Sequence, residues 1–443
     1  MGEQGVSRGM SPEELRDFTR KLLEDVQALE MMLERGMIES GKRRIGAEQE
    51  MFLVDSGHHP ACVADELIAT LDDPRFTNEL ARFNLEANAS VQDFGAGCLS
   101  ALEHELQYLV QRARIGAATM GTQVVLAGIL PTIDYRDLGL DSMTPRPRYF
   151  ELNDALRRLR GGEFRTHLKG IDELEFTHDN VMLEACNTSF QIHFQVGPSE
   201  FAKLYNVAQA VTGPVLAAAV NSPVLLGHRL WSETRIALFQ QSIDARSSVH
   251  ASRGQRARVH FGDGWVKNSV IELYREDIAR FRVLLSQAVD GNPVAQVEAG
   301  ICPQLTALRL HNGTVYRWNR PCYGVVDGVA HLRIENRVLP AGPTVLDEVA
   351  NAAFYFGLMA GMLEQPFRVE EKLSFDNAKN NFISAARTGL NAEMVWLDGE
   401  TLPARKLITT HLLPMARFGL EHVGIDAVDN DRYLGVLQER VER

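Results

Sequence analysis

The 443-residue sequence predicts an α+β fold in one large domain. Stretches in which polar and apolar side chains alternate occur at intervals along the chain, as expected for strands. Helical stretches of varied length lie between them, instead of the even strand–helix alternation that would favour a parallel sheet. No repeat, low-complexity tract or linker-like segment divides the chain.

A capped helix is the first predicted element. Ser11 is a suitable N-cap, Pro12 lies in the first turn, and Glu14 is placed to complete a capping box. Apolar residues recur at helical spacing over 15–33, and Gly36 is a C-terminal stop. We expect residues 1–40 to form a helical segment that packs on a main domain of residues 41–443.

Further strands and long helices follow from periodicity. Strands are predicted at 45–54, 83–88, 123–130, 190–196, 315–318 and 331–338. Long helices are predicted at 98–120, 198–219, 269–288 and 346–364. The tail from Ser374 onward is predicted to be helical, with a loop at Asp398-Gly399.

Composition narrows the class of partner and the compartment. The formal net charge of -12 argues against nucleic acid as the main partner. The first residues lack the apolar core of a signal peptide, and no apolar run is long enough for a membrane span. The five cysteines are scattered without a CxxC pair, which favours free thiols in a reducing compartment. We therefore expect a cytoplasmic protein that acts on small molecules, with the oligomeric state open, a homo-oligomer included.

Several predicted strands carry polar residues along one face. In the first, Glu48 and Glu50 point the same way, and two carboxylates about 7 Å apart repel unless a cation lies between them. The polar faces of the other strands comprise Arg82, Asn84, Glu86 and Asn88; Ser189, Gln191, His193 and Gln195; and His331, Arg333, Glu335 and Arg337.

Together these faces indicate a binding surface. One buried and one solvated face would explain any single strand. A solvated face usually carries lysine, threonine and serine, however, and lysine is absent from all of these strands. Carboxylates with an imidazole suit hard divalent cations, and arginines suit phosphate. A curved sheet that binds magnesium and a nucleotide on its concave face would need this set.

Ordered segments from about residue 45 to 420 resemble the glutamate–cysteine ligase type 2 family of carboxylate–amine ligases. The strand at 45–54 is similar to the family's G-x-E-x-E, and Glu79 with Glu86 to its second acidic pair. The other similar segments are Asn221-Ser222-Pro223 with Gly227 and Arg235, the stretch from His311 to Pro321, Glu335-Asn336-Arg337 with Pro343-Thr344, and Ala385 to Leu390.

The resemblance implies a glutamine synthetase-like catalytic domain, in which a curved, mainly antiparallel sheet forms an active-site funnel with helices outside. It also implies an ATP-dependent carbon–nitrogen ligase that converts a carboxylate to an acyl phosphate, which an amine then attacks. Glutamate is the expected carboxylate, and cysteine, after which the family is named, is the default amine. ATP is then a substrate and Mg²⁺, or Mn²⁺, the cofactor, because metal must neutralise the triphosphate.

The resemblance assigns roles to individual residues. The expected metal ligands are Glu48, Glu50, Glu86 and Glu335, with Glu79 and His193 as further ligands. Arg337 is expected to be catalytic by holding the γ-phosphate, and Arg235 by clamping phosphate or substrate. The expected nucleotide- or substrate-binding residues are Arg317, Arg320, Gln191, Asn221 and His311.

Some of these residues also have a structural interpretation. Arg235 could form a structural ion pair, and His311 could cap the turn that follows it. Cys186 is better explained as a buried thiol than as a nucleophile. The family often has a histidine where this chain has Gln191 and an aspartate at Pro340, departures that could alter the number of metals or the substrate.

Two alternative functions remain open at the sequence level. A guanidino kinase shares the general fold and an arginine-rich phosphate site, but its reactive-cysteine motif is missing here. A non-catalytic, nucleotide-binding regulatory protein of the same fold would have a decayed site. The retention of Glu48, Glu50, Glu86 and Glu335 counts against decay.

Overall fold

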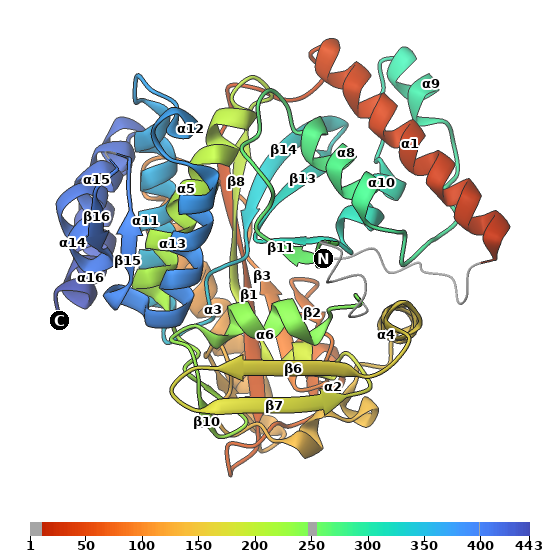
Figure 1. Cartoon of the computed structure of the whole chain (residues 1–443), viewed down its shortest axis with the longest axis vertical. Helices are drawn as coiled ribbons and strands as arrows, with labels where there is room; N and C mark the ends of the chain where they lie inside the picture. The colour runs from red at the N-terminus through yellow and green to blue at the C-terminus, as the bar shows by residue number, and fades with distance from the viewer. Residues whose placement is uncertain (1–10, 247–254, 398) are drawn as a thin grey trace.

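An antiparallel sheet runs through the centre of the computed structural model, which describes residues 11–246, 255–397 and 399–443 (Figure 1). The first ten residues of the segment predicted at 1–40, and Asp398 of the predicted loop, lie outside the described residues. Every helix in the described part is either too short or too polar to traverse a lipid bilayer.

The described part of the main sheet has eight strands in the order β13-β14-β8-β1-β3-β2, with β4 and β5 also paired to β1. All neighbouring strands in it are antiparallel. The predicted curved antiparallel sheet is thereby confirmed. Its strands are β1 (Arg44–Val54), β2 (Phe76–Asn78), β3 (Asn84–Asn88), β4 (Gln92–Asp93), β5 (Gln123–Val125), β8 (Phe190–Val196), β13 (Asn319–Val326) and β14 (Val329–Asn336).

Helices cover the apolar face of this sheet in two layers. The inner layer is α5 (Phe201–Ala219) and α11 (Val345–Leu363), which are buried around almost their whole circumference, as helices between two layers must be. Phe194 of β8 stacks on Phe356 of α11 with ring centroids 5.7 Å apart. A third helix, α3 (Cys98–Thr119), packs beside α11 against β1, β4 and β5. Outside α5 and α11 lie α13 (Phe375–Thr388), α15 (Leu413–His422) and α16 (Ala427–Glu442).

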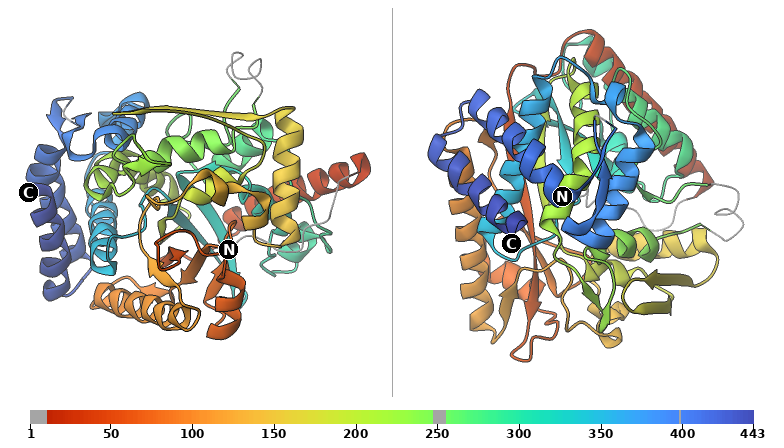
Figure 2. Two further views of the ribbon diagram at one scale, coloured as in Figure 1. Left: turned by 90° about the horizontal axis from the view of Figure 1, so that it is seen from below. Right: turned by 60° about the vertical axis from the view of Figure 1, so that its left-hand side comes forward.

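The first helix, α1 (Pro12–Glu34), lies on the opposite side of the molecule from α16 (Figure 2). Its predicted capping box is confirmed, because the Ser11 side chain accepts from Glu14 N and the Glu14 side chain from Ser11 N. The helix packs on α8 (Ile271–Arg280), α9 (Pro293–Glu298) and α10 (Thr306–Asn312). Buried Asp25 of α1 accepts a hydrogen bond from Leu308 N of α10 (2.9 Å).

The hairpin of β6 and β7 lies beneath α6 at the lower end of Figure 1, and the other short elements are distributed around the sheet and the helical layers. Neither this hairpin nor α4 is among the elements predicted from the sequence. The helices are α2 (Ala64–Leu71), α4 (Pro147–Arg160), α6 (Thr234–Ser242), α12 (Val369–Lys372) and α14 (Ala404–Leu407). The strand pairs are β6 (Phe164–Lys169) with β7 (Glu173–His178), β9 (Val224–Leu225) with β10 (His228–Arg229), β11 (Val259–His260) with β12 (Tyr316–Arg317), and β15 (Glu393–Val395) with β16 (Thr401–Pro403).

Four predicted elements differ from the structure. The tail from Ser374, predicted to be helical with a loop, contains the antiparallel strand pair β15–β16 between α13 and α14. The helix predicted at 269–288 ends at Arg280, because the chain turns extended at Phe281 and buries Phe281, Leu284 and Leu285 without helical structure. The strand predicted at 123–130 ends at Val125. The strand predicted at 315–318 is the two-residue β12, which pairs with β11 in parallel and lies outside the main sheet.

Candidate active site

The polar face of the sheet encloses a cavity of about 580 Å³. Side chains from β1, β2, β3, β8, β13 and β14 line it, so the sheet curls around the cavity. The predicted site residues on its wall are Glu48, Glu50, Glu79, Glu86, Gln191, His193, Arg320 and Arg337. Asn84 and Asn88 also line it, whereas Arg82 precedes β3 and lies 3.7 Å from Glu66.

Three carboxylates gather at one end of this cavity. One oxygen from each of Glu50, Glu79 and Glu86 lies within 4.8 Å of the others. The sheet register explains the pairing, since Glu50 of β1 lies directly opposite Glu86 of β3. Glu86 is further fixed by hydrogen bonds from Thr77 Oγ1 (2.9 Å) and Asn88 Nδ2 (2.8 Å).

The carboxylates of the acidic cluster repel one another and are buried or half-buried, so their charged forms are destabilised. Burial and the nearby charge of Glu86 raise the pKa of Glu50 to about 7, although Gln191 Nε2 and Ser189 N each donate to it at 2.6 Å. Burial and the neighbouring carboxylates Glu86 and Glu50 raise the pKa of Glu79 well above its ordinary value. A divalent cation would remove this repulsion, and carboxylate oxygens are the ligands that Mg²⁺ prefers. The cluster therefore fits a hard metal ion.

A further carboxylate, which is not among the site residues predicted from the sequence, lies beside this cluster. Glu184 lines the same cavity, and burial together with the charge of Glu50 raises its pKa to about 7. It is the only charged residue in the apolar turn Met182–Cys186, and that isolation was the signal available in the sequence. Cys186 of the same turn is fully buried, as expected for a structural thiol.

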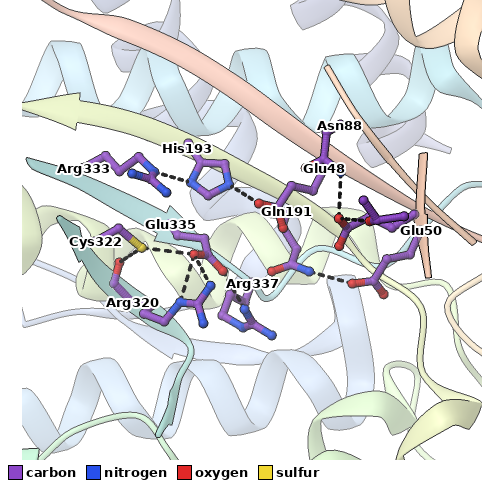
Figure 3. Close-up of polar contacts among 12 residues, drawn as sticks. Glu48, Glu50, Asn88, Gln191, His193, Arg320, Cys322, Arg333, Glu335 and Arg337 are labelled. Carbon is purple, nitrogen blue, oxygen red and sulfur yellow. Dashed lines mark hydrogen bonds and ion pairs between the residues drawn. The ribbon is translucent and has the colours of Figure 1, made fainter. Parts of the chain in front are cut away.

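Glu48 lies two residues before Glu50 on the same face of β1, and its partner is an imidazole. His193 Nε2 lies 3.0 Å from Glu48 Oε1, and Arg333 Nε donates to His193 Nδ1 (3.2 Å) (Figure 3). An arginine can only donate, so His193 Nδ1 accepts and its Nε2 carries the proton that it shares with Glu48. The structure thus joins Glu48 to an imidazole and a guanidinium, while Glu50, Glu79 and Glu86 form the candidate metal centre.

Glu335 holds two arginines of the cavity wall in place. Arg320 Nη2 donates to its Oε2 (2.7 Å) and Arg337 Nη1 to its Oε1 (2.6 Å), and the Cys322 thiol lies 3.2 Å from Oε2 (Figure 3). Burial would raise the pKa of Glu335, but the two guanidinium groups outweigh it and hold the pKa well below its ordinary value. Both oxygens of Glu335 are therefore engaged by cations, which makes it an orienting group.

Arg235 and Asn221 lie behind the cavity wall. Arg235 Nη1 donates to Glu233 (2.9 Å) and to the carbonyl of Val338 (3.1 Å), and only 4% of the residue is exposed. It borders a small second cavity of about 40 Å³ that Glu50 and Arg337 also line. Asn221 Nδ2 donates to the carbonyl of Ala341 (2.9 Å). Both residues brace the chain that follows β14.

The structure does not bring Arg317 or His311 to the cavity. Arg317 is buried and donates to Asp277 (2.7 Å) and Glu276 (2.8 Å). His311 Nε2 donates to the carbonyl of Phe281 (3.0 Å). Both side chains therefore have structural contacts that the spacing of the motif could not reveal.

Comparisons with known proteins agree with this geometry. The model of the glutamate-cysteine ligase family 2 matches residues 44–443. A glutamate–cysteine ligase from Francisella tularensis, solved in complex with AMP, has 12% identity and a TM-score of 0.57 over 91% of this chain and 83% of its own. A bifunctional glutathione synthetase from Pasteurella multocida has 11% identity and a TM-score of 0.51 over 94% of this chain and 48% of its own. At such identities these two structures show a shared fold. A comparison with curated proteins finds no significant match.

Proposed function

Because the chain belongs to glutamate-cysteine ligase family 2, we propose that it joins glutamate to an amine, with cysteine as the first candidate, through an acyl phosphate. Membership of this family makes it an ATP-dependent ligase. The choice of glutamate, the amine and the intermediate are the parts that we propose. The family match favours this reaction over the phosphotransferase and regulatory alternatives.

The observation that carries the proposal is the acidic cluster inside the cavity. Glu50, Glu79 and Glu86 would hold Mg²⁺, with Mn²⁺ as a substitute, and a bound ion would neutralise phosphate oxygens during transfer. Such a cluster has little structural purpose, because three carboxylates within 4.8 Å of one another repel when no cation is bound.

The arginines of the wall supply the remaining positive charge. A carboxylate oxygen of glutamate attacks the γ-phosphorus of ATP, ADP leaves, and negative charge spreads over the phosphoryl oxygens. Arg320 and Arg337 face the cavity and are fixed by Glu335, so they can receive that charge without reorganising. The amine nitrogen then attacks the acyl carbon, loses a proton, and releases phosphate together with the oxygen that came from the carboxylate.

A phosphate-release assay tests the proposal. The purified chain is supplied with ATP, Mg²⁺, glutamate and one amine at a time, and the amide product is identified by mass spectrometry. We expect phosphate release to require glutamate and to rise with one amine, and a Glu50→Gln variant to be inactive. ATP binding without turnover under any of these combinations would refute a ligase and support the regulatory alternative.

A further inference from the structure

Arg333 differs from the arginines that line the cavity beside it. Arg320 and Arg337 each form an ion pair with Glu335, and Arg44 forms one with Glu39 at 2.6 Å. Arg333 also lines the cavity, but among the described residues no carboxylate lies within ion-pairing distance of its guanidinium. A cation at a half-buried site is stabilised by an anion, and the described part of the chain places none in contact with it.

Two imidazoles hold this guanidinium without neutralising it. Arg333 Nε donates to His193 Nδ1 (3.2 Å), and Nη1 lies 3.4 Å from His331 Nε2 (Figure 3). Burial and the charge of Arg333 lower the pKa of His331 to about 4, so that this ring is neutral and can accept. The side chain is therefore oriented in advance, which lowers the entropic cost of binding a ligand.

The neighbouring strand leaves room for this arrangement. Gly324 of β13 lies directly opposite His331 of β14. A Cβ atom at Gly324 would lie 2.8 Å from His331 Cε1 and 3.2 Å from Arg333 Nη1. Only a glycine lets the ring and the guanidinium lie over this part of the strand, so the backbone forms a cradle for the cation.

Arg333 lies far from the acidic cluster. Ser189 N donates to Glu50, whereas Gln195 is the register partner of Arg333. These two residues of the β8 segment are separated by about 20 Å at roughly 3.3 Å per residue. A ligand group held by Arg333 is thus distinct from the phosphoryl group near the candidate metal centre.

We propose that Arg333, oriented by His193 and His331 over Gly324, binds an oxyanion, either a carboxylate or a phosphate group. That this oxyanion belongs to a substrate of the ligase rests on the proposed function. The oxyanion site itself does not, because it follows from an arginine on the cavity wall with which no carboxylate of the described residues forms an ion pair.

Direct binding measurements test the site independently of turnover. Isothermal titration of the full chain with glutamate, inorganic phosphate and a non-hydrolysable ATP analogue would be compared between wild type, Arg333→Met and Gly324→Ala. Arg165→Gln is the matched control, because Arg165 is an exposed arginine on β6 outside the cavity. Gly324→Ala keeps every charge and displaces only the tips of two side chains, so it tests the cradle in a folded chain.

We expect Arg333→Met to lower the affinity for at least one of the three ligands by about 10- to 100-fold, because a charge-assisted hydrogen bond is lost. Gly324→Ala should lower the same affinity less, and the control should leave it unchanged. An effect on glutamate alone identifies a carboxylate, and an effect on phosphate or the nucleotide identifies a phosphate group. The proposal is overturned if wild type binds none of the three more tightly than Arg333→Met does. Tight binding by wild type with no turnover would contradict the proposed ligase and leave the oxyanion site standing.

Discussion

Glu50 of β1 and Glu86 of β3 lie directly opposite each other in the antiparallel register, on the face that lines the cavity. Both are buried, and Glu79 brings a third carboxylate oxygen within 4.8 Å of theirs. The fold therefore tolerates a repulsion that a divalent cation would remove, and the first prediction tests this relationship.

Glu86→Gln should relieve the repulsion while removing a metal ligand. We expect the unliganded thermal midpoint to stay the same or rise, and the increase in midpoint on adding Mn²⁺ to be largely lost, with at least about tenfold weaker affinity. Differential scanning fluorimetry with and without Mn²⁺ measures both effects. Glu298→Gln, an exposed carboxylate on α9, is the control. Full stabilisation of Glu86→Gln by Mn²⁺ would count against the candidate metal centre.

Arg337→Lys keeps the charge but loses the planar fork that Glu335 orients. We expect kcat to fall by about 10²- to 10³-fold, the usual effect of losing a group that stabilises developing charge, with the thermal midpoint nearly unchanged. Steady-state phosphate release measures this, and Arg165→Lys is the matched control. Wild-type turnover in Arg337→Lys would show that Arg337 does not contact the reacting phosphate.

Arg317→Met should affect stability instead of binding. Arg317 is buried against Asp277 and Glu276, so its removal leaves carboxylates without their cation and should lower the free energy of unfolding by about 3–5 kcal/mol. Urea unfolding measures this change. Adding Asp277→Asn to the variant should recover part of the loss. A stable Arg317→Met protein with impaired ATP binding would instead favour the role in ligand binding expected from the motif.

Glu348 should make stability depend on pH. It is fully buried and accepts from Gly342 N, and burial raises its pKa to about 8 from an ordinary 4.5. Between these values the folded state keeps a proton that the unfolded state has lost, so stability falls as pH rises, by at most about 1.4 kcal/mol per pH unit, and levels off above pH 8. Glu348→Gln should flatten this part of the profile. Identical pH profiles of the two proteins, measured by urea unfolding, would contradict the protonated state of Glu348.

The strands of the site could be predicted from sequence because their alternation is strong. Glu48 and Glu50, or His193 and Gln195, follow the period of two that a half-buried strand requires. β13 was missed because Pro321 interrupts its pattern, and the structure places that strand at the edge of the sheet, where a proline is tolerated.

The partners of the site residues could not be predicted from sequence. The sequence around Glu335 would look the same whether this residue bound metal or oriented Arg320 and Arg337. Only its contacts in three dimensions distinguish these roles. Arg317 lies within the same motif as Arg320, yet its guanidinium points to Asp277 and not into the cavity. Residue type and spacing define a chemistry, whereas long-range packing decides which residues perform it.

The central claim, ligation through an acyl phosphate, is tested most directly by isotopic oxygen. Glutamate labelled with ¹⁸O in its side-chain carboxylate is turned over with ATP and the amine that supports phosphate release, and the phosphate is analysed by mass spectrometry. The account predicts one labelled oxygen in the inorganic phosphate for each amide formed, because the attacking carboxylate oxygen leaves with phosphorus. Label in AMP, or amide formation with unlabelled phosphate, would contradict it.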